Sequence, residues 1–224
     1  MDASFDNLDL YSLKICDPEL DEKNKIYISK INYFSNGKIN DFVFNTPNMK
    51  LISIKYYNEY YFVAELEFIL NCMEFYDFFY SIDIFIRDII LLNGEEWFGA
   101  KLNFDTLDNL FKKTVKIPKK LNSLPTIEIF IPTKFGSNFI SDCLIVNKNN
   151  EKISLEDLIE NSEISLRLNL KNINFYASKY NLNYVCEKIV LNNYEYDKNN
   201  EHLLDSCSES SGSFSDSDYI SKFH

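Results

Sequence analysis

The chain is short of the residues that catalysis and phosphate binding most often need. It has two histidines, His202 and His224, both close to the C-terminal end, and five glycines in 224 residues. A nucleophilic triad needs a histidine beside the nucleophile, and phosphate-binding loops follow the patterns GxxxxGK(S/T) or GxGxxG. Neither glycine pattern occurs in the sequence. These shortages argue against triad hydrolases and nucleotide hydrolases, and they predict a protein that is not an enzyme.

Cysteines and long apolar runs are also scarce. The five cysteines are scattered and never spaced as CxxC, which argues against a disulfide framework or a zinc site. We therefore predict no metal and no cofactor. No apolar run is long enough to cross a bilayer, and the acidic start MDASFDNLDL lacks the features of a signal peptide. We expect a soluble, intracellular protein with no membrane partner.

The net charge of -11 is unevenly distributed along the chain. Residues 1–22 carry one lysine and seven acids, and residues 191–224 carry two lysines and seven acids, which leaves 20 basic and 20 acidic residues between them. Residues 101–120 hold six lysines against two acids. A local excess of positive charge can bind phosphates, although a run of like charge is also typical of a solvated face.

Alternating apolar residues predict strands between residues 26 and 70 and again between 126 and 191. In the segment 163–173, Ile164, Leu166, Leu168 and Leu170 are expected to point inward. A hairpin with its turn near residues 177–179 should follow. Successive strands with short turns favour an antiparallel sheet or a small barrel.

One long amphipathic helix is predicted to begin near residue 73. Its apolar residues recur at helical spacing: Phe75, Phe79, Ile82, Ile86 and Ile89. Asn93 and Gly94 can end this helix, so that the segment GEEWFGAK, residues 94–101, would form its exit. We expect the helix to lie against the sheet.

The chain divides into three parts by composition. Residues 1–22 form an acidic N-terminal extension, residues 23–192 the folded domain, and residues 193–224 a serine-rich acidic tail. Low hydrophobicity and high charge predict that the tail is disordered in isolation.

Several segments resemble a family of single-stranded DNA-binding proteins of nucleocytoplasmic large DNA viruses, which is related to acidic-tailed phage proteins with the OB fold. The matching pieces are FSNGKINDFVFNTPNMKL, EEWFGAKL, LPTIEIFIPTK and INFYASKYNLNYVCEKI, which together cover about residues 24–190. The last piece departs from the family pattern, because Asn181 stands for a glycine and Tyr184 for a tryptophan.

This resemblance implies an OB-like antiparallel five-stranded barrel with one long capping helix and extra strands. Proteins that bind single strands combine a cationic groove with aromatic rings on which bases stack. We predict Trp97, Phe98 and Tyr180 as stacking residues. We predict contacts to phosphates from Lys101, Lys112, Lys113, Lys116, Arg167, Lys171 and Lys179. Core packing is the alternative role for any single aromatic residue.

The resemblance also suggests a role for the acidic tail, which in the phage proteins competes with DNA and docks on replication partners. The residues expected to act in this way are Asp205, Glu209, Phe214, Asp216, Asp218, Tyr219 and Phe223. The expected partners are single-stranded DNA and, through the tail, a polymerase or helicase-primase; a homodimer is a further expectation.

We therefore expect sequence-independent single-stranded DNA binding in viral DNA replication, recombination and repair. The expected location is a cytoplasmic viral factory or the host nucleus, with packaging in the virion as a further expectation. The alternative is a protein-interaction or virion structural module that has the same barrel and does not bind DNA. The net acidity of the chain favours this alternative.

Overall fold

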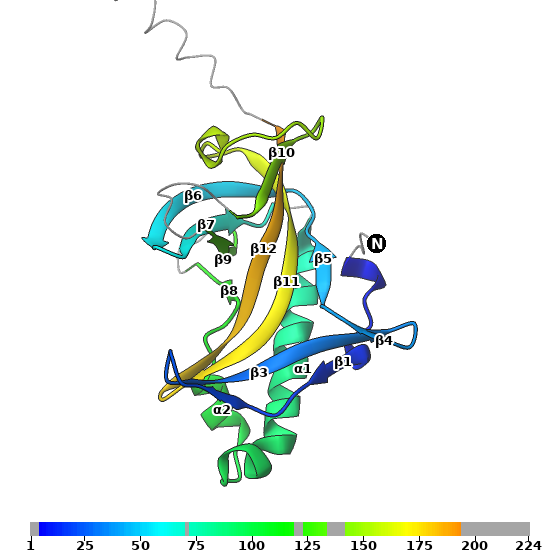
Figure 1. The fold of residues 1–224 in the computed structure, drawn as a ribbon, viewed down its shortest axis with the longest axis vertical. Helices are drawn as coiled ribbons and strands as arrows, with labels where there is room; N and C mark the ends of the chain where they lie inside the picture. Colours follow the sequence, from blue (N-terminus) through cyan, green and yellow to red (C-terminus); the bar gives the residue numbers. More distant parts are fainter. Residues whose placement is uncertain (1–4, 70–71, 119–122, 134–141, 194–224) are drawn as a thin grey trace, which may run out of the picture. The chain divides into compact units, whose positions relative to one another are not determined.

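Five strands close into a ring in the computed structural model, which describes residues 5–69, 72–118, 123–133 and 142–193 (Figure 1). In ring order these strands are β6 (Met49–Asn58), β7 (Tyr61–Glu67), β9 (Thr126–Pro132), β12 (Lys179–Asn193) and β11 (Glu163–Tyr176). All neighbouring strands in the ring are antiparallel except β9 and β12, which meet in parallel at Phe130 and Val185. The prediction of a mainly β, OB-like fold with a long helix is confirmed.

Side-chain alternation explains why these segments form the barrel. Along β9, Ile127, Ile129 and Ile131 are buried, and the residues between them are partly exposed. The inward residues predicted on β11, from Ile164 to Leu170, are all buried as well. Each strand thus turns one face into a shared apolar core and leaves the other face toward solvent.

In the described part of the chain, seven further strands pair with the strands of the ring or with one another. Five of them come before the ring in the sequence: β1 (Leu13–Ile15), β2 (Glu19–Asp21), β3 (Ile26–Ser35), β4 (Lys38–Asn40) and β5 (Val43–Asn45). The others are β8 (Val115–Lys116), which pairs with β9, and β10 (Leu144–Asn147), which pairs with β12. Strands β1 and β2 both pair with β3, so this part of the acidic N-terminal segment is built into the sheet.

Short helical turns complete the frame. Residues Phe5–Asn7, Leu10–Ser12 and Leu155–Asp157 form 3-10 helices. The last of these has a capping box, in which the Ser154 backbone N–H donates to the Asp157 carboxylate at 2.6 Å. Residues 177 and 178 form the turn between β11 and β12, which confirms the predicted hairpin.

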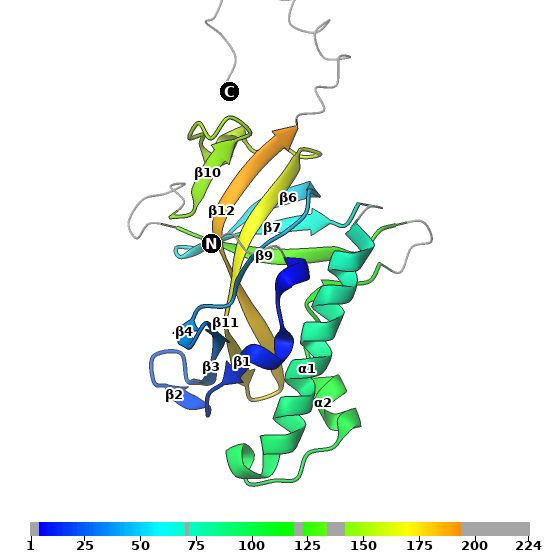
Figure 2. The ribbon, with the colours of Figure 1, turned by 90° about the vertical axis from the view of Figure 1, so that its right-hand side faces the viewer.

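Helix α1 (Met73–Phe98) runs along one side of the barrel, and the shorter α2 (Phe104–Leu110) follows it (Figure 2). The buried residues of α1 begin as predicted, but Ile90 and not Ile89 continues the stripe after Ile86. A step of four keeps Ile90 on the side that faces the core, whereas Ile89 is rotated partly toward solvent. Among the described helices, none combines the length and apolar character needed to cross a membrane.

The helix continues past the predicted end at Gly94. Gly94 lies inside α1, where a Cβ atom would come within 2.8 Å of the Leu102 side chain, so glycine allows the returning chain to pack closely. The helix ends at Gly99, which has a φ of 65° and donates its N–H to the Glu95 carbonyl at 3.0 Å. Gly99 is therefore the residue that ends the helix, because glycine adopts positive φ at no steric cost.

We predict that Phe79→Ala lowers the free energy of unfolding by about 3–5 kcal/mol, the usual cost of emptying a buried aromatic site. Phe79 is fully buried, and its ring lies 4.7 Å from that of Phe75 and 5.3 Å from that of Tyr184. Urea unfolding measures the change. Tyr80→Ala, at the neighbouring residue that is 58% exposed, is the matched control and should stay within about 0.5 kcal/mol of the parent protein. Equal losses in both variants would contradict this assignment of the core.

Candidate nucleic-acid interface

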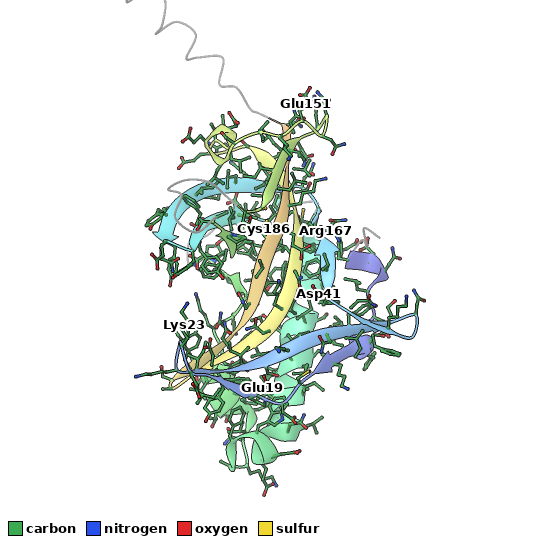
Figure 3. The ribbon with its side chains drawn as sticks, viewed as in Figure 1. Glu19, Lys23, Asp41, Glu151, Arg167 and Cys186 are labelled. Atoms are coloured by element: carbon green, nitrogen blue, oxygen red, sulfur yellow. The ribbon has the colours of Figure 1, made fainter. Side chains whose placement is uncertain are left out.

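A groove of about 670 Å³ lies beside the tip of the β11–β12 hairpin. Its walls come from the β2–β3 turn, which carries Lys23 (Figure 3), and from the β6–β7 hairpin with β9. Aromatic rings and amides make up most of the lining: Tyr57, Tyr60, Tyr61, Phe130, Tyr176, Asn24, Asn58, Asn172, Asn174, Asn181 and Asn183. Lys23, Ile26 and Ile28 complete it.

Strand alternation at the hairpin tip separates the groove from the core. Asn172 pairs with Asn183, and Asn174 pairs with Asn181 across the two strands, so the four amides share the groove face. Phe175 and Tyr180 are also paired, and both are buried on the opposite face. One short hairpin therefore presents polar side chains to the groove and apolar rings to the core.

The groove tyrosines are accessible as flat surfaces. Tyr57, Tyr60 and Tyr176 are 62%, 38% and 41% exposed. The Phe130 ring supports the wall, because its centroid lies 5.5 Å from that of Tyr57 and 5.7 Å from that of Tyr61, both edge-on. Burial raises the pKa of Tyr176, and the charge of a nearby ionised Tyr57 would raise that pKa further, which indicates that the two phenols lie near each other. Such rings offer stacking surfaces for planar ligands.

The charge of the groove differs from that of the chain as a whole. Among the described residues that line it there is no aspartate or glutamate, although the chain has 34 of them. Lys23 Nζ lies 5.6 Å from the centroid of the Tyr60 ring, and Lys179 Nζ lies 5.4 Å from that of Tyr176. The groove can therefore accept a polyanion whose charge the rest of the molecule would repel.

The predicted lysines 112 and 113 lie next to this groove. A smaller hollow is lined by Lys112, Lys113 and Glu128 among others, and it shares Phe130 and Asn181 with the groove. Glu128 pairs with Lys112 at 3.8 Å and with the predicted Lys116 at 2.5 Å, which offsets part of their positive charge. Lys179, at the hairpin tip, is the other predicted cation that the structure brings to this region.

Trp97 and Phe98 do not line the groove. The Trp97 Nε1–H donates to the Asp17 carboxylate at 3.0 Å, and the indole is partly buried against the core. The Phe98 ring is 39% exposed and lies 5.2 Å from that of Phe175, on the core side of the hairpin. Lys101 is exposed in the segment that follows this helix end. The stacking of bases on Trp97 and Phe98 stays a prediction, and in the structure both rings pack on the core side of the hairpin, outside the groove.

Tyr180 is also a core residue. Its ring is 3% exposed and stacks on the Phe111 ring, with a centroid distance of 5.0 Å and an interplanar angle of 22°. Burial raises the pKa of the Tyr180 hydroxyl well above its usual value. The stacking of a base on Tyr180 also stays a prediction, and in the structure the Phe111 ring covers one face of the Tyr180 ring.

The remaining predicted cations lie elsewhere on β11. Arg167, which is labelled in Figure 3, donates from Nε to the Glu187 carboxylate at 3.3 Å. It lines a separate small hollow with Lys188. Lys171 is exposed at the bulge that precedes Asn172. The predicted tail residues, from Asp205 to Phe223, lie outside the described residues. Within the described part of the chain, no group of three or more His, Cys, Asp or Glu side chains could hold a metal ion.

Two sequence signals could have located the groove. The segment KYYNEYY, residues 55–61, places four tyrosines around one hairpin turn, where a small core cannot bury them all. Asparagine alternates with apolar residues in both arms of the 172–183 hairpin. Because asparagine is unfavourable in strands, its repetition on one face of a hairpin indicates a role other than β-sheet formation.

Comparison with known proteins gives likenesses of fold only. No family model and no curated protein matches the chain. The single-stranded DNA-binding protein gp2.5 of bacteriophage T7 is 11% identical, covers 79% of this chain and 100% of its own, and has a TM-score of 0.49. The single-stranded DNA-binding protein of bacteriophage Enc34 is 13% identical, covers 80% of this chain and 89% of its own, and has a TM-score of 0.42.

The Enc34 protein in complex with single-stranded DNA is also similar, with 13% identity, coverage of 79% of this chain and 94% of its own, and a TM-score of 0.42. At such low identities and TM-scores, these likenesses establish neither the family nor the ligand of this chain.

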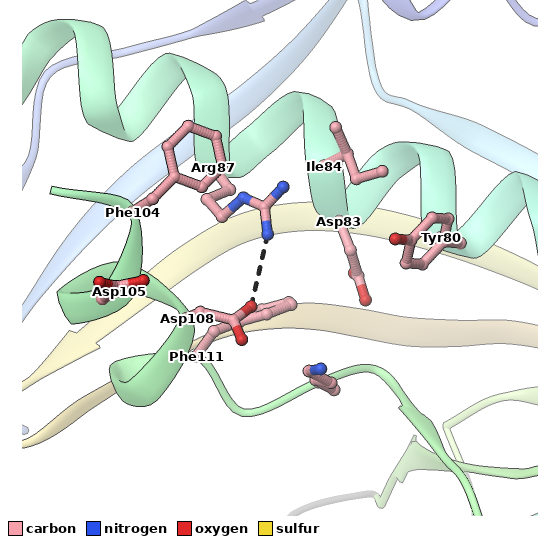
Figure 4. A pocket seen from close by; sticks show the side chains of 9 residues that line it. Tyr80, Asp83, Ile84, Arg87, Phe104, Asp105, Asp108 and Phe111 are labelled. Carbon is pink, nitrogen blue, oxygen red and sulfur yellow. Dashed lines mark hydrogen bonds and ion pairs between the residues drawn. The ribbon is translucent and has the colours of Figure 1, made fainter.

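Another hollow lies between α1 and α2 and contains a carboxyl group with a raised pKa (Figure 4). Burial raises the pKa of Asp83 from 3.8 to about 7, although the Thr114 hydroxyl, 2.9 Å from its Oδ1, and the charges of Lys113 and Arg87 act in the opposite direction. Arg87 is held by Asp108 at 3.4 Å and by the Phe104 ring at 4.6 Å, so it pairs with another carboxylate.

We predict that Asp83→Asn stabilises the protein at pH 8 and has little effect at pH 4. The folded-state pKa is raised, so the parent loses stability as the pH rises from about 3.8 to about 7. The full loss is on the order of 2–4 kcal/mol. Thermal unfolding across this pH range measures the difference. Asp88→Asn, at an exposed position of the same helix, should leave the pH profile unchanged; an unchanged profile in Asp83→Asn would contradict the prediction.

Proposed function

We propose that the groove at the hairpin tip binds single-stranded nucleic acid, with DNA as the ligand, without sequence preference and without catalysis. The observation that carries this proposal is an open groove, lined by exposed tyrosines and by asparagines that are mostly partly buried, with no acidic lining residue in the described part of an acidic chain. Every base has a flat π-face, so stacking on tyrosine tolerates any sequence.

In this proposal, aromatic rings bind the bases by stacking, and lysines bind the phosphates. Each stacked base contributes roughly 1–3 kcal/mol, and Tyr57, Tyr60 and Tyr176 offer three accessible rings. Lys23 and Lys179 lie over two of these rings, and Lys112 and Lys113 continue the positive charge into the adjoining hollow. A strand that follows the groove would then pass these cations with its phosphates.

The wider biological setting is part of the proposal. The domain at residues 23–192 would bind single strands during viral DNA replication, recombination and repair, in a viral factory or the host nucleus. The acidic tail at 193–224 would compete with DNA and recruit a polymerase or helicase-primase. The resemblance of four sequence segments to viral single-stranded DNA-binding proteins supports this setting, as do the opposite charges of the tail and the groove. Homodimer formation and packaging in the virion belong to the same proposal.

We expect Tyr57→Ala and Tyr176→Ala each to weaken the binding of a fluorescent oligo(dT) by about 5- to 150-fold, the equivalent of one lost base stack. Fluorescence anisotropy at low salt measures the affinity. Tyr27→Ala is the matched control, because Tyr27 is 50% exposed on β3 but lies between the groove residues Ile26 and Ile28 on the other face of the strand. Binding that the groove variants leave intact would contradict the proposed location.

We expect a chain that ends at residue 193 to bind oligo(dT) several-fold more tightly than the full chain at low salt. The removed segment carries seven acids and two lysines, and its attraction to a cationic surface is screened as salt increases. Titrations of both chains at two salt concentrations measure this effect. The same affinity for both chains at low salt would contradict competition by the tail.

A protein-interaction module is the second candidate function. The groove is rich in tyrosine and asparagine, which also dominate the adaptable binding surfaces of antibodies, and the whole chain is acidic. Capture of a partner that resists nuclease treatment, together with no binding of oligo(dT) by the tail-less chain, would favour this function over DNA binding.

A further inference from the structure

We propose that the asparagine floor of the groove reads the hydrogen-bonding edge of an unpaired base, chiefly through Asn181. The inference rests on the proposed function and names what the groove recognises. It makes Asn181 the residue that distinguishes an unpaired base from a paired one.

Three amides of the floor, those of Asn172, Asn174 and Asn183, are already oriented by one another. Asn183 Nδ2 donates to Asn172 Oδ1 at 3.1 Å, and Asn172 Nδ2 donates to Asn174 Oδ1 at 2.5 Å. The first contact joins facing residues of the two strands and the second joins two residues of β11, so these amide planes are set before a ligand arrives. A preorganised polar surface binds a ligand with a smaller loss of side-chain entropy.

The side-chain oxygen of Asn181 accepts no hydrogen bond within the described part of the chain. This Oδ1 atom is buried, whereas Nδ2 of the same amide donates to the Leu182 carbonyl at 3.4 Å. Leaving a buried acceptor without a donor is unfavourable, and a donor brought by a ligand removes that cost. Asn181 lines the groove, so a small rotation of its side-chain amide would turn this acceptor toward a ligand that brings the donor.

The position of Asn181 suits the edge of a base. It lies where the groove meets the smaller hollow that contains Lys112 and Lys113, and it shares both linings with Phe130. The exposed Tyr57 packs against the same Phe130 ring. A base whose face rests on the tyrosine wall would thus direct its edge toward the amide floor.

The group that would complete the hydrogen bonding of Asn181 Oδ1 is an N–H donor on a planar ring. The edges that thymine and guanine use for pairing each present a ring N–H, and adenine and cytosine present amino groups there. In a duplex the complementary strand occupies these donors. An acceptor on the groove floor therefore favours an unpaired strand over a duplex. Contacts to phosphates alone would not make this distinction, because both kinds of strand carry phosphates.

A methyl group on one nitrogen tests this recognition directly. The full-length protein is titrated with a fluorescent oligo(dT) and with the same oligomer made from N3-methylthymidine, which keeps the phosphates and the stacking face but lacks the edge N–H. We expect the methylated oligomer to bind about tenfold or more weakly, as for a lost hydrogen bond to a buried group.

Asn181→Ala should weaken the binding of oligo(dT) by a similar factor and remove the difference between the two oligomers. Asn149→Ala, at an exposed turn position outside the groove, is the control and should preserve that difference. Equal binding of both oligomers to the parent protein would overturn edge recognition while leaving the proposed function intact. Failure of both oligomers to bind at low salt, even to the chain without its tail, would overturn the proposed function and this inference together.

Discussion

The two faces of one hairpin tip determine where this protein can bind a ligand. At residues 172–183 the chain alternates between asparagines and large apolar side chains, and the two strands are paired so that like residues meet. The apolar face seals the core against α2 and the end of α1, where Tyr180 stacks on Phe111 and Phe98 packs against Phe175. The asparagine face of the hairpin therefore faces the solvent and lines the groove.

This constraint also explains the distribution of charge around the groove. A polar amide floor needs no counter-charge, so the described lining residues include one lysine and no acid. Asp21 shapes the adjoining β2–β3 turn by accepting hydrogen bonds from the Lys23 backbone N–H at 3.0 Å and from Asn24 Nδ2 at 2.7 Å. The described acidic residues near the groove do not line it: Asp21 accepts hydrogen bonds in the β2–β3 turn, and Glu128 pairs with Lys112 and Lys116.

Periodic sequence patterns predicted the helices and strands. The residues that individual aromatic side chains contact could not be predicted in this way. The alternation of β11 and the helical spacing from Phe75 to Ile86 located the barrel and its helix, because these patterns depend only on local geometry. Trp97 was expected in the site because it follows a helix and precedes a lysine-rich segment. Its actual environment depends on Asp17, 80 residues away in the chain, and no local pattern contains that contact.

The groove combines residues from the β2–β3 turn, the β6–β7 hairpin, β9 and the final hairpin, so its composition appears only in three dimensions. Single lysines near residue 112 could be predicted from the charge of the segment. The tyrosines opposite them could not, because their distance from those lysines is set by how β7, β9 and β12 pair. The long-range pairing of strands thus accounts for most of what sequence alone left undetermined.

The position of the bound strand is the most direct test of this description. An oligo(dT) that carries 5-iododeoxyuridine can be photo-crosslinked to the full-length protein, and the crosslinked peptides can be identified by mass spectrometry. We predict crosslinks to Tyr57, Tyr60 and Tyr176, the exposed rings of the groove. Crosslinks confined to Trp97 and Phe98 would contradict the groove as the binding surface.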